Sequence, residues 1–505
     1  MKTNMHSNNL KPACGNTTAP LRCRGSSREL RPGAILLGAA ATGLLLLAPP
    51  ASAGDIFVIA MENHNFTQPN PASGPQQILG NPAAPFLNSL LTPGHPNAAQ
   101  VSYATAYYNA GAHVHPSEPN YVWAEAGTDF GVHTDADPKP ANGNTFYDQS
   151  VHLAAQLNVA GIPWKNYQED VELSSSPTNS AAGANAPGLN PYYGTAQYNY
   201  AVKHNPMAFF ADTALQNVYP LAQLFLDLKS DTVGRYNWIT PNQFNDAHSA
   251  LSGGFTYEGV HYTGDQASVA QGDNFLAQVI PQLMASRAYQ DNGLIIIWWD
   301  ETEGGDDTNH TIPEVIISPL AKGNAYASSV PLNHSSDIKT IEELFHLPSL
   351  NNPIPAAETN VTGSGYNNAA LVNDLSDLFV PGAIPAAPQM SVTRSPLVRD
   401  RHTGHVLQLV KLQNTGASPV PAPLFLVLDN LSPNAALLNA AGTCAVLAPL
   451  GSPYVLVRND DGHDEESDEN LLRPHASTTV FLEFLAPAGD EIDYDTRLLS
   501  VTPAP

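Results

Sequence analysis

Short, continuous apolar segments recur along the first two-thirds of the chain. Residues 55–61 (DIFVIAM) and 294–299 (LIIIWW) are almost entirely apolar and run directly into polar residues, and a shorter segment at 315–318 follows. Segments of this length, interleaved with helical periodicity, are typical of strands buried on both faces of a parallel sheet. We therefore predict an α/β domain over residues 54–380, with a central, mostly parallel sheet flanked by helices.

Helical periodicity predicts two helices in the second half of this domain. They span residues 274–289 and 337–345, and Ser335 or Ser336 is the expected N-cap of the second. Residues 173–197 are rich in Ser, Asn, Ala, Gly and Pro, which predicts an irregular surface loop.

The pattern changes after residue 380. Residues 381–396 are rich in Pro and Ala and are expected to form a linker. Beyond the linker the helical period disappears, and the spacing of short apolar segments predicts a small β-sandwich over residues 397–505. The expected strands lie at residues 405–412, 424–428, 454–458 and 478–484. Residues 460–469 carry seven carboxylates in a spacing that matches no EF-hand, so a solvated hairpin tip is preferred to a calcium loop.

The first 53 residues have the organisation of a secretory signal peptide. Four arginines precede the apolar residues 34–48, and the small residues Ala51, Ser52 and Ala53 follow. We predict cleavage near Ala53 and a secreted or periplasmic protein without a stable membrane span, the alternative being an uncleaved anchor. Cleavage would leave Cys444 as the only cysteine, so a large core rather than a disulfide must stabilise the protein.

The net charge of the chain bears on whether it binds nucleic acid. The chain has 46 acidic and 21 basic residues and a formal net charge of −25, although only 13% of its residues are charged. Such a chain does not bind nucleic acid through phosphate contacts, so no nucleic-acid partner is expected.

Polar residues at the ends of the two long apolar segments are candidate metal ligands. Glu62 and Asn63 follow the first segment and could supply two oxygen ligands, although from these two residues alone a loop-capping pair is the preferred interpretation. Asp300 and Glu301 follow the second. Further acidic or imidazole groups come soon after, namely Glu303, Asp306, Asp307 and His310. So many carboxylates repel one another unless a cation or solvent screens them, which favours a divalent metal site over a solvated loop.

A serine and several histidines supply the remaining candidate chemistry. Pro119 fits the first turn of a helix, which places Ser117 near the N-cap, where a phosphoryl group or an alkoxide is stabilised. An ordinary capping serine is the alternative. Asp246 and His248 are two apart and would share one face of an extended segment, and His204 and His334 are further candidates. A lone histidine is more often structural, so these assignments depend on the acidic clusters.

Seven motifs occur in an order that resembles the bacterial and fungal phosphoesterase family, which includes acid phosphatases and non-haemolytic phospholipases C and has an alkaline-phosphatase-like fold. The resemblance spans about residues 55–347. The motifs are MENHNF, HPSEPNY, WKNY, KHNP, TPNQFNDAH, WWDE and NHSSDIKTIEELF.

The resemblance implies a role for each candidate. It places metal ligands at Glu62, Asn63, Asp300 and Glu301, and the nucleophile at Ser117. His204 and His248, with Asp246 beside them, would be catalytic-pocket residues, while His115 and His334 match the pattern less closely. The identity and number of the metal ions stay open, and Asp246 and His248 are either ligands of a second ion or direct contacts to the phosphoryl group.

These observations predict an exported, metal-dependent acid phosphatase that hydrolyses small phosphomonoesters through a phosphoserine. The alternative is a phospholipase C-type phosphodiesterase acting on phospholipid head groups. It is disfavoured because the phospholipase members continue Glu-Asn-Arg-Ser-Phe-Asp where this chain has ENHNFT. The region around Ser117 lacks the sulfatase pattern Cys/Ser-x-Pro-x-Arg, and a non-catalytic binding protein would leave the ordered motifs unexplained. Because Arg235 and Arg287 are the only arginines in residues 54–385, Lys165 or Lys203 would have to assist in binding phosphate.

Overall fold

A computed structural model defines the fold. It describes residues 54–68, 77–111, 114–136, 138, 152–171, 199–214, 216–303, 310–347, 349–350, 352, 372–385, 390–416, 419–421, 423–444, 451–457, 471–487 and 492–499. The predicted signal peptide, the loop at 173–197, the acidic segment 460–469, and Asp306 and Asp307 lie outside these residues.

An eight-stranded sheet lies at the centre of the first domain, in the order β10-β2-β9-β8-β1-β5-β3-β4. Its strands are β1 (Ile56–Met61), β2 (Val101–Ala104), β3 (Trp164–Gln168), β4 (Val218–Pro220), β5 (Tyr236–Thr240), β8 (Leu294–Trp299), β9 (Glu314–Ile317) and β10 (Tyr326–Ser328). Both long apolar segments, β1 and β8, are fully buried and pair in parallel. Among the described strands of this sheet only β9 is antiparallel to its neighbours, so the predicted α/β class with a mostly parallel sheet is confirmed.

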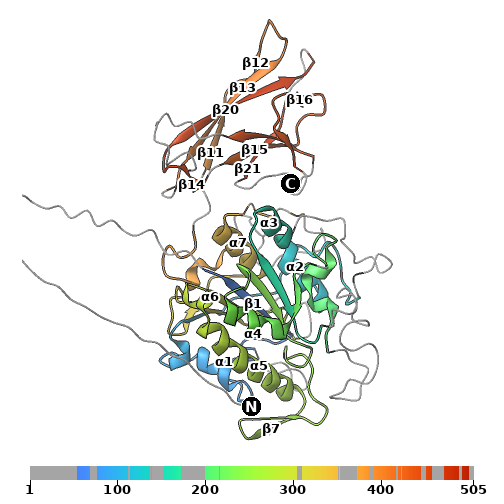
Figure 1. The fold of residues 1–505 in the computed structure, drawn as a ribbon, viewed down its shortest axis with the longest axis vertical. Coiled ribbons are helices and arrows are strands. Elements are labelled where there is room, and N and C mark those ends of the chain that lie inside the picture. The colour runs from blue at the N-terminus through green and yellow to red at the C-terminus, as the bar shows by residue number, and fades with distance from the viewer. Residues whose placement is uncertain are drawn as a thin grey trace, which may run out of the picture. The chain divides into compact units, whose positions relative to one another are not determined.

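Helices cover the sheet on both faces, with α1, α5 and α6 on one side and α2, α3 and α7 on the other (Figure 1). The helices are α1 (Pro85–Leu90), α2 (Ser117–Ala126), α3 (Leu153–Val159), α4 (Leu221–Ser230), α5 (Asp265–Ala285), α6 (Arg287–Gln290) and α7 (His334–Phe345). Shorter elements are the 3-10 turns η1 (Pro96–Ala98), η3 (Val202–His204), η4 (Pro206–Phe209) and η5 (Leu375–Leu378), and the hairpin β6 (Phe255–Tyr257) and β7 (Val260–Tyr262). Within the described residues no helix is both long enough and apolar enough to cross a bilayer.

Two helix boundaries differ from the prediction. The helix expected at 274–289 starts earlier, as α5, and is interrupted at Ser286, whose hydroxyl caps α6 by accepting from the Tyr289 amide. The predicted N-cap of α7 is wrong. Asn333 caps this helix, because its side chain accepts from the Ser335 amide at 3.0 Å while Ser336 Oγ accepts from the Asn333 amide at 3.1 Å.

The C-terminal part consists of antiparallel sheets, as predicted. One contains β11 (Met390–Arg394), β13 (Val406–Asn414), β20 (Ser477–Leu485) and β16 (Ala436–Leu437), with β12 (Val398–Arg399) beside β13. The other contains β17 (Gly442–Thr443), β18 (Pro453–Val457), β15 (Leu424–Asp429) and β21 (Asp495–Leu499). A small ladder joins β14 (Val420–Pro421) to β19 (Leu471–Leu472). Val410 and Leu482 of the first sheet share one apolar core with Leu426 and Val455 of the second, which makes a sandwich.

Two details concern the segments around this sandwich. Strand β11 begins at Met390, inside the range expected to be a linker. Cys444 is buried and carries a free thiol, in keeping with a fold that a hydrophobic core stabilises.

Candidate active site

Neighbouring strands bring the predicted residues to one edge of the central sheet. Glu62 follows β1, Asp246 lies in the loop after β5, and Asp300 follows β8, which are three adjacent strands. The carboxyl ends of parallel strands meet at the same edge, where functional groups of α/β folds gather. The Glu62 amide donates to the Asp246 carbonyl at 2.9 Å, which joins two of these loops directly.

Ser117 is the first residue of α2, following the N-cap Pro116. Its Oγ is buried, donates to Glu62 Oε2 at 3.0 Å and lies 3.5 Å from Asn63 Oδ1. The serine predicted as nucleophile therefore faces the acidic residues that follow β1. It also lies in the first turn of a ten-residue helix, where backbone amides favour an anion.

Asn63 connects the two acidic strand ends. Its amide donates to Asp300 Oδ1 at 2.9 Å, and its Nδ2 donates to Glu301 Oε1 at 3.0 Å. The other oxygen of Glu301 lies 2.7 Å from His115 Nδ1. The four residues predicted as metal ligands, Glu62, Asn63, Asp300 and Glu301, thus lie side by side, with Asn63 as the donor between two carboxylates.

His204, from η3, lies between two buried carboxylates. Its Nε2 is 2.9 Å from Glu62 Oε1, and its Nδ1 is 3.5 Å from Asp246 Oδ2. Burial acts to lower the His204 pKa, but the Glu62 charge outweighs it and the pKa lies above its ordinary value. Burial likewise acts to raise the Glu62 pKa, and the neighbouring His204 charge holds it well below its usual range. The two groups therefore form an ion pair.

Tyr121 is a site residue that the motifs contained but the prediction missed. Its ring stacks on the His204 ring with centroids 4.8 Å apart and planes 11° apart. Tyr121 lies one helical turn after Ser117 on α2, so the i, i+4 spacing was the signal that places both on one face. The stacking fixes the orientation of His204.

His248, Lys203 and Lys165, the remaining predicted site residues with a basic side chain, differ in their surroundings. The His248 side chain is exposed, with Nδ1 2.9 Å from Ser249 Oγ, and its amide donates to Asp246 Oδ1 at 2.8 Å. Lys203 forms an ion pair with Asp135 at 2.9 Å, and the charge of Glu62 helps to raise its pKa despite burial. Lys165 instead pairs with Asp227 at 2.6 Å, away from these groups.

The residues present fit a divalent cation. Asp300 Oδ2 and Asp246 Oδ2 are buried without a hydrogen-bond partner among the described residues, and the Glu62 Oε1–His204 Nε2 ion pair lacks hydrogen-bond geometry. The ligand atoms of Glu62, His204 and Asp246 lie within 4.8 Å of one another. Burial and the neighbouring Glu62 and Glu301 charges raise the Asp300 pKa well above its ordinary value, the signature of crowded carboxylates that a cation would relieve.

His334 contacts the site through the backbone carbonyl of Asp300. Its Nε2 donates to the Asp300 carbonyl at 2.5 Å, while Nδ1 accepts from Trp298 Nε1 at 3.0 Å and lies 2.8 Å from Tyr107 Oη. Burial lowers its pKa to about 3, so it is neutral. We therefore assign His334 to the support of the Asp300 strand end rather than to catalysis.

Behind His334 lies a buried acid pair. Tyr107 Oη donates to Asp337 Oδ2, and the buried Asp337 and Glu314 carboxyl groups act on each other electrostatically. Burial is the main cause that raises the pKa of Asp337 to about 7, and it raises that of Glu314 well above its ordinary value. Because so close a pair cannot ionise together, it holds at least one proton at neutral pH.

This pair predicts how stability depends on pH. An acid whose folded-state pKa is raised stabilises the protein below its unfolded pKa, and that stability is lost as pH rises through the folded value. In metal-free protein we expect the free energy of unfolding to fall between about pH 4 and pH 7, and Asp337→Asn to reduce this fall by on the order of 1–3 kcal/mol. Urea unfolding of both proteins at pH 5 and pH 7.5 measures the effect, and equal pH dependences would contradict it.

A family model identifies the family of the chain. Residues 97–348 match the model of the phosphoesterase family. The chain belongs to the phosphoesterase family, as its ordered motifs predict, and is a hydrolase of phosphate esters. Ser117, His204, Asp246, Asp300 and Glu301 lie inside the matched segment.

Curated relatives match about half of the chain. A phosphatidylinositol-3-phosphatase of Mycobacterium tuberculosis is 26% identical over 54% of this chain and 73% of its own length. A probable acid phosphatase of Kluyveromyces lactis is 25% identical over 53% of this chain and 59% of its own. A phosphate-repressible acid phosphatase of Penicillium chrysogenum is 24% identical over 47% of this chain. The chain thus spans half to three-quarters of the length of these relatives.

Solved structures of low similarity also match. One is a protein in the alkaline phosphatase superfamily from Vibrio parahaemolyticus, 13% identical, with a TM-score of 0.38 over 73% of this chain and 82% of that chain. Another is the lipoteichoic acid synthase LtaP from Listeria monocytogenes, 12% identical, with a TM-score of 0.36 over 72% of this chain and 85% of that chain.

Proposed function

We propose that this protein is an exported, metal-dependent phosphomonoesterase of the acid phosphatase type, with Ser117 as its nucleophile. The observation that carries the proposal is the position of Ser117 Oγ, in the first turn of α2 and 3.0 Å from Glu62 within a buried cluster of carboxylates. The curated relatives support the substrate class, because their names describe acid phosphatases and a phosphoinositide phosphatase. Export rests on the predicted signal peptide, which N-terminal sequencing of exported protein would test.

The metal ligands are proposed from the cluster around Glu62. Two candidate ligand sets share Glu62. One is the predicted set, which also contains Asn63, Asp300 and Glu301. In the other, ligand atoms of Glu62, His204 and Asp246 lie close together. A divalent cation bound here would lower the pKa of the Ser117 hydroxyl and offset the charge of the phosphoryl group. The amides at the start of α2 and the Lys203 ammonium supply further positive charge to a domain with few arginines.

The reaction follows from the positions of the residues. Ser117 would release its hydroxyl proton to solvent as Oγ attacks phosphorus in line. The ester P–O bond breaks, and the leaving alkoxide takes a proton from a histidine, which regains one from solvent. Water then cleaves the phosphoserine, releasing phosphate and restoring the hydroxyl. His248 is better placed than His204 to give that proton, because both nitrogens of His204 face buried carboxylates whereas the His248 side chain is exposed.

Replacement of His248 tests this assignment. We expect His248→Asn to lower kcat for an alkyl phosphate by about 100-fold to 10,000-fold. The loss should be much smaller for p-nitrophenyl phosphate, whose leaving group departs without protonation. Steady-state kinetics on both substrates measures the difference, and equal losses would exclude His248 as the general acid.

A paired substrate assay tests the phosphomonoesterase assignment. We expect hydrolysis of p-nitrophenyl phosphate at least about 100-fold faster than that of bis(p-nitrophenyl) phosphate and phosphatidylcholine, because a second ester group occupies an oxygen that the cation and the helix amides would bind. The Ser117→Ala protein is the blank for each substrate. Faster hydrolysis of phosphatidylcholine would instead identify the phospholipase C-type activity.

A further inference from the structure

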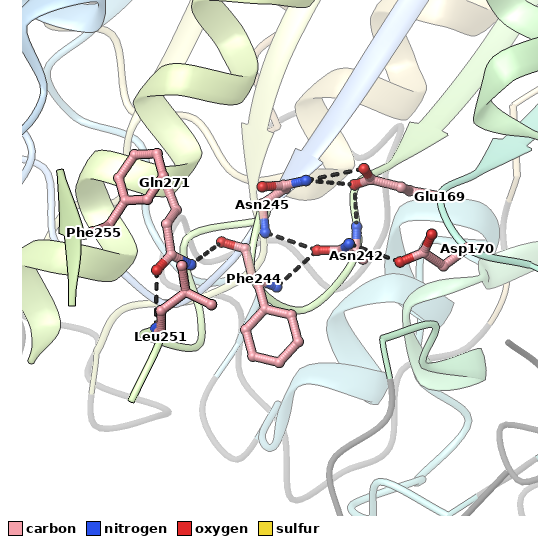
Figure 2. A pocket seen from close by; sticks show the side chains of 8 residues that line it. All are labelled: Glu169, Asp170, Asn242, Phe244, Asn245, Leu251, Phe255 and Gln271. Atoms are coloured by element: carbon pink, nitrogen blue, oxygen red, sulfur yellow. Dashed lines mark hydrogen bonds between the residues drawn. The ribbon is translucent and has the colours of Figure 1, made fainter. Parts of the chain in front are cut away.

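A pocket of about 240 Å³ opens beside the reaction centre, at the same edge of the sheet. Glu169 and Asp170, which follow β3, form one wall with Asn242 and Asn245 from the loop after β5. Phe244, on the same loop, separates this polar wall from Phe255 and its neighbours (Figure 2). The pocket therefore has an acidic side and an aromatic side.

The pocket shares a loop with the proposed catalytic groups. Asn242 and Asn245 line the pocket, and the next residue, Asp246, faces His204. Glu169 binds the loop on the pocket side, accepting from the Asn242 amide at 2.8 Å and from Asn245 Nδ2 at 2.9 Å. A group bound in the pocket would thus lie next to the loop that carries Asp246.

Most polar atoms of the pocket that stay available to a ligand are hydrogen-bond acceptors. The Asn242 side chain keeps at most one N–H for a ligand, because its Oδ1 accepts from the Phe244 and Asn245 amides and its Nδ2 donates one hydrogen to Asp170 Oδ2 at 2.9 Å. The carboxylates of Glu169 and Asp170 keep further lone pairs. Among the lining residues, all of which the structure describes, none is basic.

We propose that this pocket binds the alcohol part of the phosphate ester and selects alcohols that carry hydrogen-bond donors and no second negative charge. Hydroxyl groups would donate to the Glu169 and Asp170 carboxylates, while the carbon skeleton packs against Phe244 and Phe255. An anionic group on the alcohol would meet the Asp170 carboxylate and the carboxyl group of Glu169, whose pKa burial raises to about 7, without a basic residue in the pocket lining. The proposal rests on the proposed phosphomonoesterase function and adds the class of alcohol.

Two substrates of nearly equal shape test the selectivity. Glycerol 3-phosphate and 3-phosphoglycerate differ by a hydroxymethyl group in one and a carboxylate in the other. We expect kcat/KM of the holoenzyme for glycerol 3-phosphate to exceed that for 3-phosphoglycerate by about tenfold or more, because like charges a few ångströms apart repel strongly at a partly shielded surface. The substitution Asp170→Asn should lower this ratio by about threefold to tenfold.

A matched control separates the pocket from the charge of the whole domain. Asp231 is also an exposed aspartate, and its backbone is left-handed like that of Asp170, with φ 56° against 59°. Asparagine is tolerated in this conformation. Asp231 pairs with Arg287 at 3.2 Å. Asp231→Asn should leave the substrate ratio unchanged. Equal ratios in the wild type, Asp170→Asn and Asp231→Asn would overturn the pocket assignment alone. No hydrolysis of any monoester, p-nitrophenyl phosphate included, would overturn the phosphomonoesterase function and the pocket assignment with it.

Discussion

The Ser117→Ala protein should lose at least about 1,000-fold in kcat for p-nitrophenyl phosphate while keeping its fold. The substitution removes the oxygen that lies 3.0 Å from Glu62 Oε2 and would form the bond to phosphorus. The expected cost in stability is only about 1 kcal/mol, since one hydrogen bond is lost and alanine is an excellent helix former. Acid-quenched wild-type enzyme should carry a phosphoserine at residue 117, and the variant should carry none.

Ser286→Ala provides the matched control. Ser286 is likewise a buried serine at the start of a helix, where it caps α6, away from the acidic strand ends. Its replacement should reduce stability by about 1 kcal/mol and leave kcat unchanged. Near-normal turnover by Ser117→Ala, with its thermal transition intact, would exclude Ser117 as the nucleophile.

Replacement of Glu62 should abolish both activity and the response to metal. Glu62 belongs to both candidate ligand sets, contacts Ser117 and forms an ion pair with His204. We expect Glu62→Gln to reduce kcat by at least about 1,000-fold. Wild-type protein freed of metal by a chelator should be inactive, and added divalent cation should raise its melting temperature, because a ligand that binds only the folded state stabilises it. The variant should show little of this shift.

Glu314→Gln is the corresponding control for a buried glutamate in the same domain. Glu314 faces Asp337 and holds a raised pKa, so the neutral glutamine should be tolerated there, with activity and metal response preserved. Full activity of demonstrably metal-free wild-type protein would contradict the metal proposal. A normal melting shift in Glu62→Gln would show that the cation binds elsewhere.

The two-sided burial of β1 and β8 made part of the site predictable. An apolar strand inside a parallel sheet is followed by a loop at the functional edge, so local pattern favoured the acidic cluster that begins at Asp300 as a metal site, whereas Glu62 depended on the family resemblance. The ordered motifs added the family, which the family match confirms, and with it Ser117 as the predicted nucleophile.

Side-chain partners were less predictable than side-chain positions. His334 and His204 are both candidates in the sequence, yet His334 is a neutral support behind Asp300 and His204 faces Glu62 and Asp246. The N-cap of α7 is Asn333 rather than the predicted Ser335 or Ser336. Asn333 and Ser336 satisfy each other's backbone groups, which residue preference alone does not specify.

By itself, the sequence determined the α/β class, the buried strands and the chemical types gathered at their ends, because periodicity and composition act over a few residues. Only the tertiary structure decided which groups meet. Ser117 lies 55 residues from Glu62, Asn63 bonds to an aspartate 237 residues away, and the acidic pocket combines loops after β3 and β5. Protonation and pairing in such a cluster depend on burial and on neighbours distant in the chain, which local pattern does not contain.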